Sequence, residues 1–120
     1  MKYMFLIYTE EATEPQVGSP EFDAMMEGYF AFTADVQQKG IMERGAPLEQ
    51  TDTATTVRVR NGQVRTFDGP FAETKEQLGG FYILDCENLD EALGYAARIP
   101  GASLGSVEVR PVRPYEMPEM

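Results

Sequence analysis

The densest group of chemically capable side chains in this sequence lies between residues 68 and 77. It comprises Asp68, Glu73, Thr74, Lys75, Glu76 and Gln77. A carboxylate beside other carboxylates has a raised pKa, whereas one beside an ammonium group stays ionised. Carboxylates around Lys75 therefore suit acid–base chemistry, with Asp68 or Glu76 as the base and Lys75 as its electrostatic partner. The same groups also suit a polar ligand or a hard cation such as Mg²⁺, which accepts one or two carboxylates plus water.

The same segment also has a purely structural interpretation. Asp68-Gly69-Pro70 is typical of a turn, because Asp bonds nearby backbone amides and Gly permits a tight bend. Phe71 would then be a core residue, and the charged residues after it a solvated helical turn. The residues alone leave both interpretations open.

Other candidate ligand-binding residues lie outside this segment. Arg44, beside Gly45, could clamp a ligand carboxylate or pair with an acid of its own chain. Tyr8, Tyr29 and Tyr82 could line a pocket with apolar walls and polar tips, although core packing is an alternative for at least two of them. The predicted ligand-binding set is Tyr29, Arg44, Asp68, Glu73, Lys75, Glu76 and Tyr82.

Composition excludes several classes of function. The chain has no His and a single Cys, Cys86, so it has no Ser-His-Asp triad, no His-ligated metal site and no internal disulfide. Ten Lys and Arg against 20 Asp and Glu give a net charge of −10, which disfavours direct binding to nucleic acid or to an anionic membrane. We expect no metal and no cofactor. Since no segment resembles a signal peptide or a membrane span, a cytoplasmic protein is expected.

The elements that must position these residues are strands and helices in alternation. The expected strands are residues 2–8, 41–44, 53–60, 63–67, 80–86 and 106–112. The first and the fifth are apolar at consecutive positions, which is typical of central strands covered on both faces. Asn61-Gly62 predicts a two-residue hairpin turn.

Two helices are expected between these strands. The first has Ser19 as N-cap, Pro20 at its first position and a stop at Gly40, and the second runs from the cap Asn88 to Pro100. Their predicted buried stripes are Phe22, Met25, Met26, Tyr29, Thr33 and Val36 in the first and Ala92, Leu93, Ala96 and Ile99 in the second. Asp35 is expected on the polar face of the first helix.

This order predicts an α+β fold of the ferredoxin-like split βαβ type with an extra β-hairpin, in one domain over residues 1–112, followed by a tail over residues 113–120 that is loose or packed on a neighbour. Helices cover one face of such a sheet, so the other apolar face needs a cover. We predict a homodimer with the two sheets face to face. In the alternative, the hairpin and the tail fold over that face within a monomer.

The segment DGPFAETKEQLGGFYILD, with KYMFLIY, GIMERGAPL, EALGYAARIP and GSVEVRP, resembles the DGPF-motif branch of the YCII-related family. This resemblance implies a dimeric ferredoxin-like α+β barrel. Some related YCII proteins are thought to act as enzymes through a His-Asp pair. This chain lacks His, and Tyr29 falls near the position of such a His. We therefore do not assign a catalytic His-Asp pair to this chain.

Two functions of different classes follow. In the first, a homodimer binds a small polar metabolite in a cleft lined by the DGPF-to-Glu76 loop and the first helix, with metal-independent acid–base chemistry as its extension. In the second, the protein is a non-catalytic regulatory or interaction module with a partner linked to an extracytoplasmic-function sigma factor. The resemblance favours this second class, because genes of the DGPF branch often lie beside genes for such sigma factors. The acidic composition also favours it, since acidic groups could contact a basic region of a partner.

Overall fold

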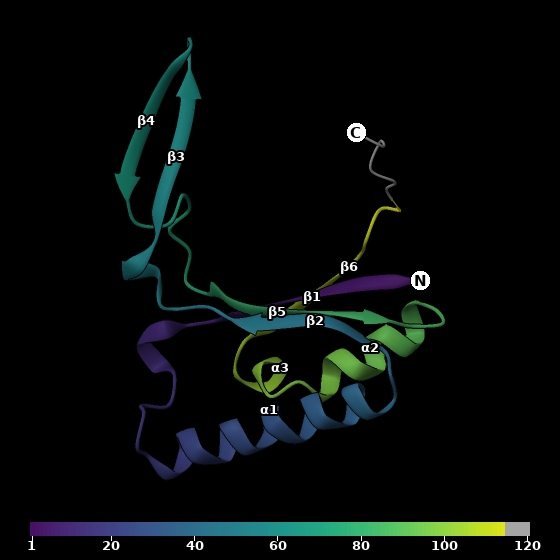
Figure 1. The fold of residues 1–120 in the computed structure, drawn as a ribbon. Helices are drawn as coiled ribbons and strands as arrows, with labels where there is room; N and C mark the ends of the chain where they lie inside the picture. The colour runs from purple at the N-terminus through teal and green to yellow at the C-terminus, as the bar shows by residue number, and fades with distance from the viewer. Residues whose placement is uncertain (115–120) are drawn as a thin grey trace.

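The computed structural model describes residues 1–114 as a four-stranded sheet with helices on one face and a separate two-stranded hairpin (Figure 1). The strands are β1 (Lys2–Thr9), β2 (Met42–Pro47), β3 (Thr55–Arg60), β4 (Gln63–Asp68), β5 (Gln77–Asp85) and β6 (Ser106–Pro111). The helices are α1 (Pro20–Gln38), α2 (Leu89–Arg98) and the short α3 (Gly101–Leu104), and single turns of 3₁₀-helix, η1 and η2, span Glu11–Thr13 and Thr51–Thr53. Most of the predicted tail, residues 115–120, lies outside the described residues.

The sheet has the predicted topology. Its strand order is β2-β5-β1-β6, and every neighbouring pair is antiparallel, so the first and the fifth strand are central. Phe5 of β1 lies between Tyr82 of β5 and Val109 of β6. With two βα units and this order, the chain is a ferredoxin-like α+β fold with an inserted hairpin, which confirms the fold class.

The core lies between the sheet and the helices. Alternate residues of the two central strands, among them Phe5 and Leu84, are fully buried against Phe32 and Val36 of α1 and Ile99 after α2. Because successive strand residues point to opposite faces, the residues between them lie on the other face of the sheet. No helix of the described residues covers that second face (Figure 1).

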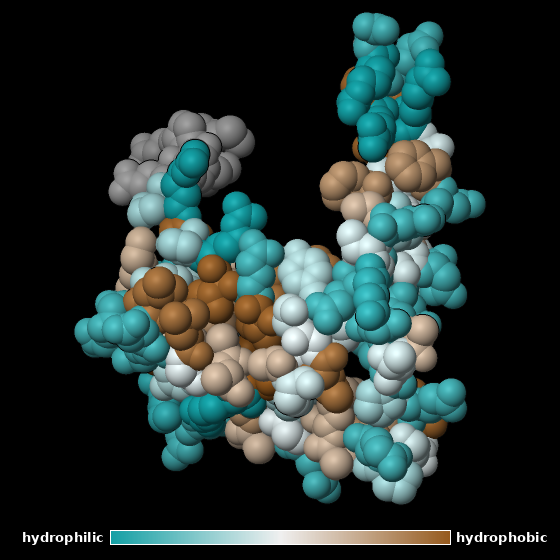
Figure 2. Space-filling model, turned by 180° about the vertical axis from the view of Figure 1, so that it is seen from behind, coloured by the Kyte–Doolittle hydropathy of each residue, from teal (hydrophilic) through white to brown (hydrophobic). Residues whose placement is uncertain are grey.

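We call this second surface the open face. It carries the partly exposed apolar side chains of Met4, Leu6, Phe81 and Ile83, which are cross-strand neighbours in the register of β1 and β5. Seen from behind, hydrophobic side chains gather on the body beside the hollow next to the hairpin (Figure 2). The prediction of an apolar second face is confirmed.

Helix α1 begins and ends where its sequence signals place it. The Ser19 hydroxyl accepts a hydrogen bond from the Phe22 amide at 3.1 Å, and Gly40 adopts the positive φ of 72° that a helix stop favours. Phe32, which the predicted stripe omitted, is buried. Asp35 is partly exposed on the polar side of the helix, as predicted, and its carboxylate lies toward α2.

Asp35 links the two long helices. Its carboxylate accepts hydrogen bonds from Arg98 at 2.8 Å and from Lys39 at 3.1 Å. These two bonds, that of Arg98 first, hold the pKa of Asp35 below its ordinary value. The Arg98 guanidinium also lies 5.5 Å from the ring centres of Phe32 and Tyr95.

Helix α2 starts at its predicted cap, since the Asn88 side chain accepts a bond from the Glu91 amide at 2.9 Å. Leu93 was predicted to be buried, and this was wrong. Ala92, Ala96 and Ile99 are buried, but Leu93 is exposed, since it lies one residue past the narrow stripe that faces the sheet. The short helix α3, directly after Pro100, was not predicted.

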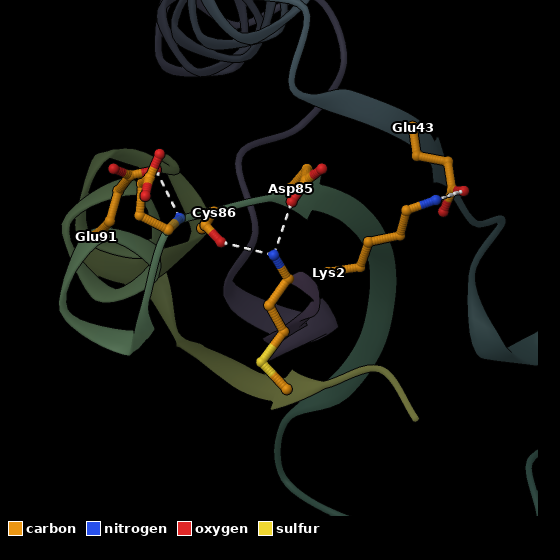
Figure 3. A network of polar contacts seen from close by, with 7 residues as sticks. Lys2, Glu43, Asp85, Cys86 and Glu91 are labelled. Carbon is orange, nitrogen blue, oxygen red and sulfur yellow. Dashed lines mark hydrogen bonds and ion pairs between the residues drawn. The ribbon is translucent and has the colours of Figure 1, made fainter. Parts of the chain in front are cut away.

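A polar network closes one end of the central strands (Figure 3). The amino group of Met1 lies 2.9 Å from Asp85 Oδ1 and 3.0 Å from the carbonyl oxygen of Cys86, and Lys2 pairs with Glu43. Cys86 itself is buried, and desolvation is the main cause that raises the pKa of its thiol. The network ties β1 to its neighbours at the end opposite the hairpin. Among residues 1–114, no helix combines the length and apolarity that a bilayer crossing needs.

Candidate functional site

The polar segment predicted to carry chemistry is the connection from the hairpin to β5. Gly69 makes its turn with a φ of 105°; its amide donates to the Ala54 carbonyl at 2.7 Å, and its own carbonyl accepts from the Thr56 hydroxyl at 2.8 Å. These bonds fix the connection to the base of β3. The tight bend at Gly69 is confirmed. The predicted bond from the Asp68 side chain to backbone amides is not found among the described residues, and backbone groups and Thr56 hold the bend instead.

The rest of the structural interpretation was wrong. Phe71 is 75% exposed, so it is no core residue, and residues 71–76 form no helical turn. The connection is instead held by hydrogen bonds of its own. The Thr74 hydroxyl donates to the Glu76 carbonyl at 2.6 Å, and the Gln77 amide group donates to the Thr74 carbonyl at 2.7 Å.

The charged side chains of this connection do not form a compact set. Within residues 1–114, Lys75 makes no ion pair with Asp68, Glu73 or Glu76. The Glu76 carboxylate accepts a hydrogen bond from the Ser106 hydroxyl of β6 at 2.8 Å. Over the same described range, no group of three or more acidic or thiol side chains is arranged to hold a metal ion.

A cavity of about 540 Å³ lies beside this connection. One wall comes from the segment 70–74 without Glu73 and the other from the segment 48–54 without Asp52, and Tyr8 of β1 with Gln77 and Leu78 of β5 completes the lining. The volume falls within the range of small-molecule sites. No residue of α1 lines it, because α1 covers the opposite face of the sheet (Figure 1). A cleft shared by the connection and α1 is therefore not formed within one chain.

The lining combines apolar walls with hydrogen-bonding groups. Leu78, Pro70 and Phe71 supply apolar surface, whereas hydroxyl and amide groups come from residues such as Tyr8 and Gln50. One acid, Glu49, and no Lys or Arg is part of the lining. Such a surface fits a compound with an apolar framework and several hydroxyl or carbonyl groups better than a strongly anionic one.

The wall formed by residues 48–54 was missed by the sequence reasoning. Glu11 of η1 fixes it, because its carboxylate accepts bonds from the Thr51 amide at 2.9 Å and the Thr51 hydroxyl at 2.6 Å. The run QTDTATT from Gln50 to Thr56, dense in hydroxyl groups directly after a strand, was the signal available in the sequence. Its position next to residues 70–74 depends on a contact 40 residues away in sequence.

Tyr29 and Tyr82 lie on the other side of the sheet, among the helices. The Tyr82 hydroxyl is 2.7 Å from that of Thr33, and an added Cβ on Gly101 would lie 2.9 Å from the Tyr29 hydroxyl oxygen. Burial is the main cause that raises the pKa of both phenols. Glu14, which bonds to the buried Thr9 hydroxyl, adds a smaller contribution at Tyr29.

Arg44 lies on the open face, opposite Ile83 in the register of β2 and β5. No acid of residues 1–114 is within ion-pair distance of it. The predicted ligand-binding residues thus lie in three places: the connection after the hairpin, the open face and the helix side of the sheet.

Comparison with known proteins shows the family to which the chain belongs. The model of the YCII-related domain matches residues 1–116. The chain belongs to the YCII-related family. An uncharacterized protein of Rhizobium meliloti (strain 1021) is 39% identical over 122 residues, which cover all of this chain and 98% of that protein.

A solved structure is similar more loosely. It is the 5-chloro-2-hydroxyhydroquinone dehydrochlorinase from Burkholderia phenoliruptrix AC1100 in complex with 2,5-dihydroxybenzoquinone. Its TM-score is 0.48 at 17% sequence identity, over 94% of each chain. The fold described above rests on the strand order of this YCII-related chain itself.

Proposed function

We propose that this YCII-related protein binds a small polar metabolite in the cavity beside the DGPF loop, Asp68–Phe71. The observation that carries the proposal is the cavity of about 540 Å³ between residues 48–54 and 70–74. Both walls are held by specific hydrogen bonds, Glu11 to Thr51 on one side and Gly69 to Ala54 on the other. A preformed cavity of this kind lowers the entropic cost of ligand binding.

The polar groups of the lining favour an uncharged or weakly charged ligand. Tyr8, Gln50 and Gln77 offer donors and acceptors, and the exposed ring of Phe71 offers a face for stacking. Acid–base turnover without metal or cofactor is the extension of this proposal. It would use Asp68 or Glu76 as the base and Lys75 as its electrostatic partner. These three residues lie just outside the lining, at the two ends of the wall, and in the described residues Lys75 pairs with neither carboxylate, so a ligand would have to bring them together.

A thermal-shift screen of the purified protein against a panel of metabolites tests binding. A ligand at about 100 times its dissociation constant adds roughly 2.7 kcal/mol, which raises the Tm by several degrees at this size. Ala72→Leu fills the cavity from the wall and is expected to abolish the shift. Ala31→Leu makes the same change on the exposed side of α1 and is expected to keep it.

The double variant Asp68→Asn, Glu76→Gln then separates binding from turnover. We expect it to fold and to lose turnover of any compound that the wild type converts. If no compound raises the Tm of the wild type, ligand binding is refuted, and the class of interaction modules takes its place. If Ala72→Leu keeps the full shift, the ligand binds elsewhere.

We also propose that the protein is a homodimer that packs its two open faces together. What supports this is the apolar surface of Met4, Leu6, Phe81 and Ile83, which no helix of the described chain covers. A soluble monomer rarely exposes a large contiguous apolar surface. Light scattering coupled to size exclusion measures the mass in solution, and a monomer at micromolar concentration would contradict the homodimer.

A further inference from the structure

The hairpin of residues 55–68, which we call the arm, stands almost alone. Its strands β3 and β4 pair with each other, and neither packs substantially against another helix or strand of the described chain (Figure 1). The radius of gyration is 16.6 Å, whereas a compact chain of this length has one of about 14 Å. Since an isolated two-stranded hairpin is at best marginally stable in water, the arm needs a surface to pack on.

One face of the arm is apolar and exposed. Val57, Val59 and Val64 lie on this face and are 59%, 57% and 69% exposed. Val59 and Val64 are direct cross-strand neighbours beside the Asn61-Gly62 turn. Three exposed valines on one side of a projecting hairpin are what a contact surface requires, and they contribute little to a hairpin in solvent.

The opposite face of the arm carries uncompensated positive charge. Arg58 and Arg65 are direct cross-strand neighbours, an arrangement of like charges that destabilises an isolated hairpin. Within residues 1–114, neither they nor Arg60 makes an ion pair. Arg58 lies over the ring of Phe67 at 5.9 Å. Carboxylates from outside the arm would offset this repulsion.

The charge of the chain is divided sharply between the arm and the remainder. The arm, residues 55–68, holds three of the ten basic residues and one acid, Asp68, a net charge of +2. The other 106 residues hold seven basic and 19 acidic residues, a net charge of −12. The electrostatic complement of the arm is therefore the body of the same protein, but the arm of one chain projects away from its own body.

We infer that the arm docks on the body of a second copy of this chain, in a reciprocal exchange of arms. The second copy offers both complements, an apolar open face and a strongly acidic body. The arm stands on the open-face side of the sheet, so packing two open faces together brings each arm alongside the partner (Figures 1 and 2). A two-fold axis makes the two contacts identical. This inference rests on the homodimer proposed above and names the segment that secures it.

The first test removes the apolar contact. The double variant Val59→Asp, Val64→Asp is expected to raise the dissociation constant of the dimer at least about 100-fold, since four valines per dimer lose their buried position. Val17→Asp is the matched control, because Val17 is 84% exposed in a loop outside the arm. Sedimentation equilibrium measures the dissociation constants.

The second test reports on burial directly and leaves the arm intact. The chain contains no Trp, so Val64→Trp introduces a single fluorophore at the tip of the arm. Its emission is expected to be blue-shifted at concentrations at which the dimer forms and to move to longer wavelength on dilution. Arg58→Glu with Arg65→Glu is expected to weaken the dimer, most strongly at low salt.

The outcomes separate the arm exchange from the homodimer. A dimer whose dissociation constant is unchanged by Val59→Asp, Val64→Asp, with a solvent-exposed fluorophore at position 64 at every concentration, overturns the arm exchange and leaves the face-to-face dimer standing. A monomeric wild type overturns both. A blue-shifted emission at a dilution at which sedimentation finds only monomer means that the arm packs on its own chain, which also overturns the exchange.

Discussion

Among the glycines, Gly105, the residue between α3 and β6, has the least room for a side chain. A Cβ built on it would lie 2.1 Å from the carbonyl oxygen of Tyr8 and 3.0 Å from the Cα of Thr9. Its backbone has φ −160° and ψ −125°, which is neither a strand nor a helix conformation, and the added Cβ would meet these atoms directly. The atoms in the way belong to the backbone of a central strand. Gly105→Ala must therefore push the start of β6 away from β1.

The cost of this change can be estimated from the geometry. Relief of the contact requires a displacement of about 1 Å, and overpacking of this kind costs about 1–3 kcal/mol. Loss of the first backbone hydrogen bond between Tyr8 and Ser106 adds about 1 kcal/mol. Alanine also lowers the conformational entropy of the unfolded chain, which offsets about 0.4–1 kcal/mol of this loss of stability. Together these contributions are expected to lower the free energy of unfolding by about 1–4 kcal/mol.

Urea denaturation at 25 °C measures this, and Gly94→Ala is the control. Gly94 lies inside α2 with nothing within 4 Å of its added Cβ, so the same substitution is expected to stabilise by about 0.5–1 kcal/mol. The two variants are expected to change the free energy of unfolding in opposite directions, which separates the steric effect at Gly105 from any general effect of Gly→Ala. If Gly105→Ala unfolds within about 0.5 kcal/mol of the wild type, the close approach of β6 to β1 is refuted.

Three further expectations concern the core and its edges. Leu84→Ala is expected to lower the free energy of unfolding by about 2–5 kcal/mol, because Leu84 is fully buried. Leu93→Ala is expected to lower it by less than about 0.5 kcal/mol, because Leu93 is exposed. Equal losses for the two variants in urea titrations would contradict the burial described. The hydrogen bond from Arg98 lowers the pKa of Asp35 in the folded state below its value in the unfolded state. The stabilisation of the fold by the ionised Asp35 is therefore complete above the unfolded-state pKa and is lost as the pH falls through the folded-state pKa. The wild type should therefore lose more stability than Asp35→Asn between pH 6 and pH 2, and parallel loss would argue against the ion pair. The raised pKa and burial of Cys86 predict slow reaction with a thiol reagent in the native state and fast reaction in urea, and similar rates would show an accessible thiol.

Much of the fold was predictable because its signals are local. Strands with apolar residues on both faces identified the two central strands, and the Asn61-Gly62 dipeptide, with φ values of 54° and 76°, identified the hairpin. The caps Ser19 and Asn88 identified both long helices. Each of these signals is contained within a few residues, so no tertiary contact can override it easily.

The features that were missed depend on contacts between distant segments. Leu93 fits a helical stripe, but only the packing of α2 on the sheet decides how wide the buried stripe is. The wall of residues 48–54 has no periodicity, and its place is set by Glu11. Likewise, no pattern within β3 and β4 indicates that the hairpin projects from the sheet instead of lying on it.

The central position of β1 has a consequence for synthesis in the cell. Its partners β5 and β6 lie within residues 77–111, so β1 leaves the ribosome well before the strands that pair with it. At about 5–20 residues per second, the delay is on the order of 5–20 s. Throughout this time a strand with apolar residues on both faces stays unpaired, which makes it a target for chaperones and for misassembly between nascent chains. The acidic residues Glu10, Glu11 and Glu14 directly follow β1, and charges that flank an apolar strand in general disfavour its stacking.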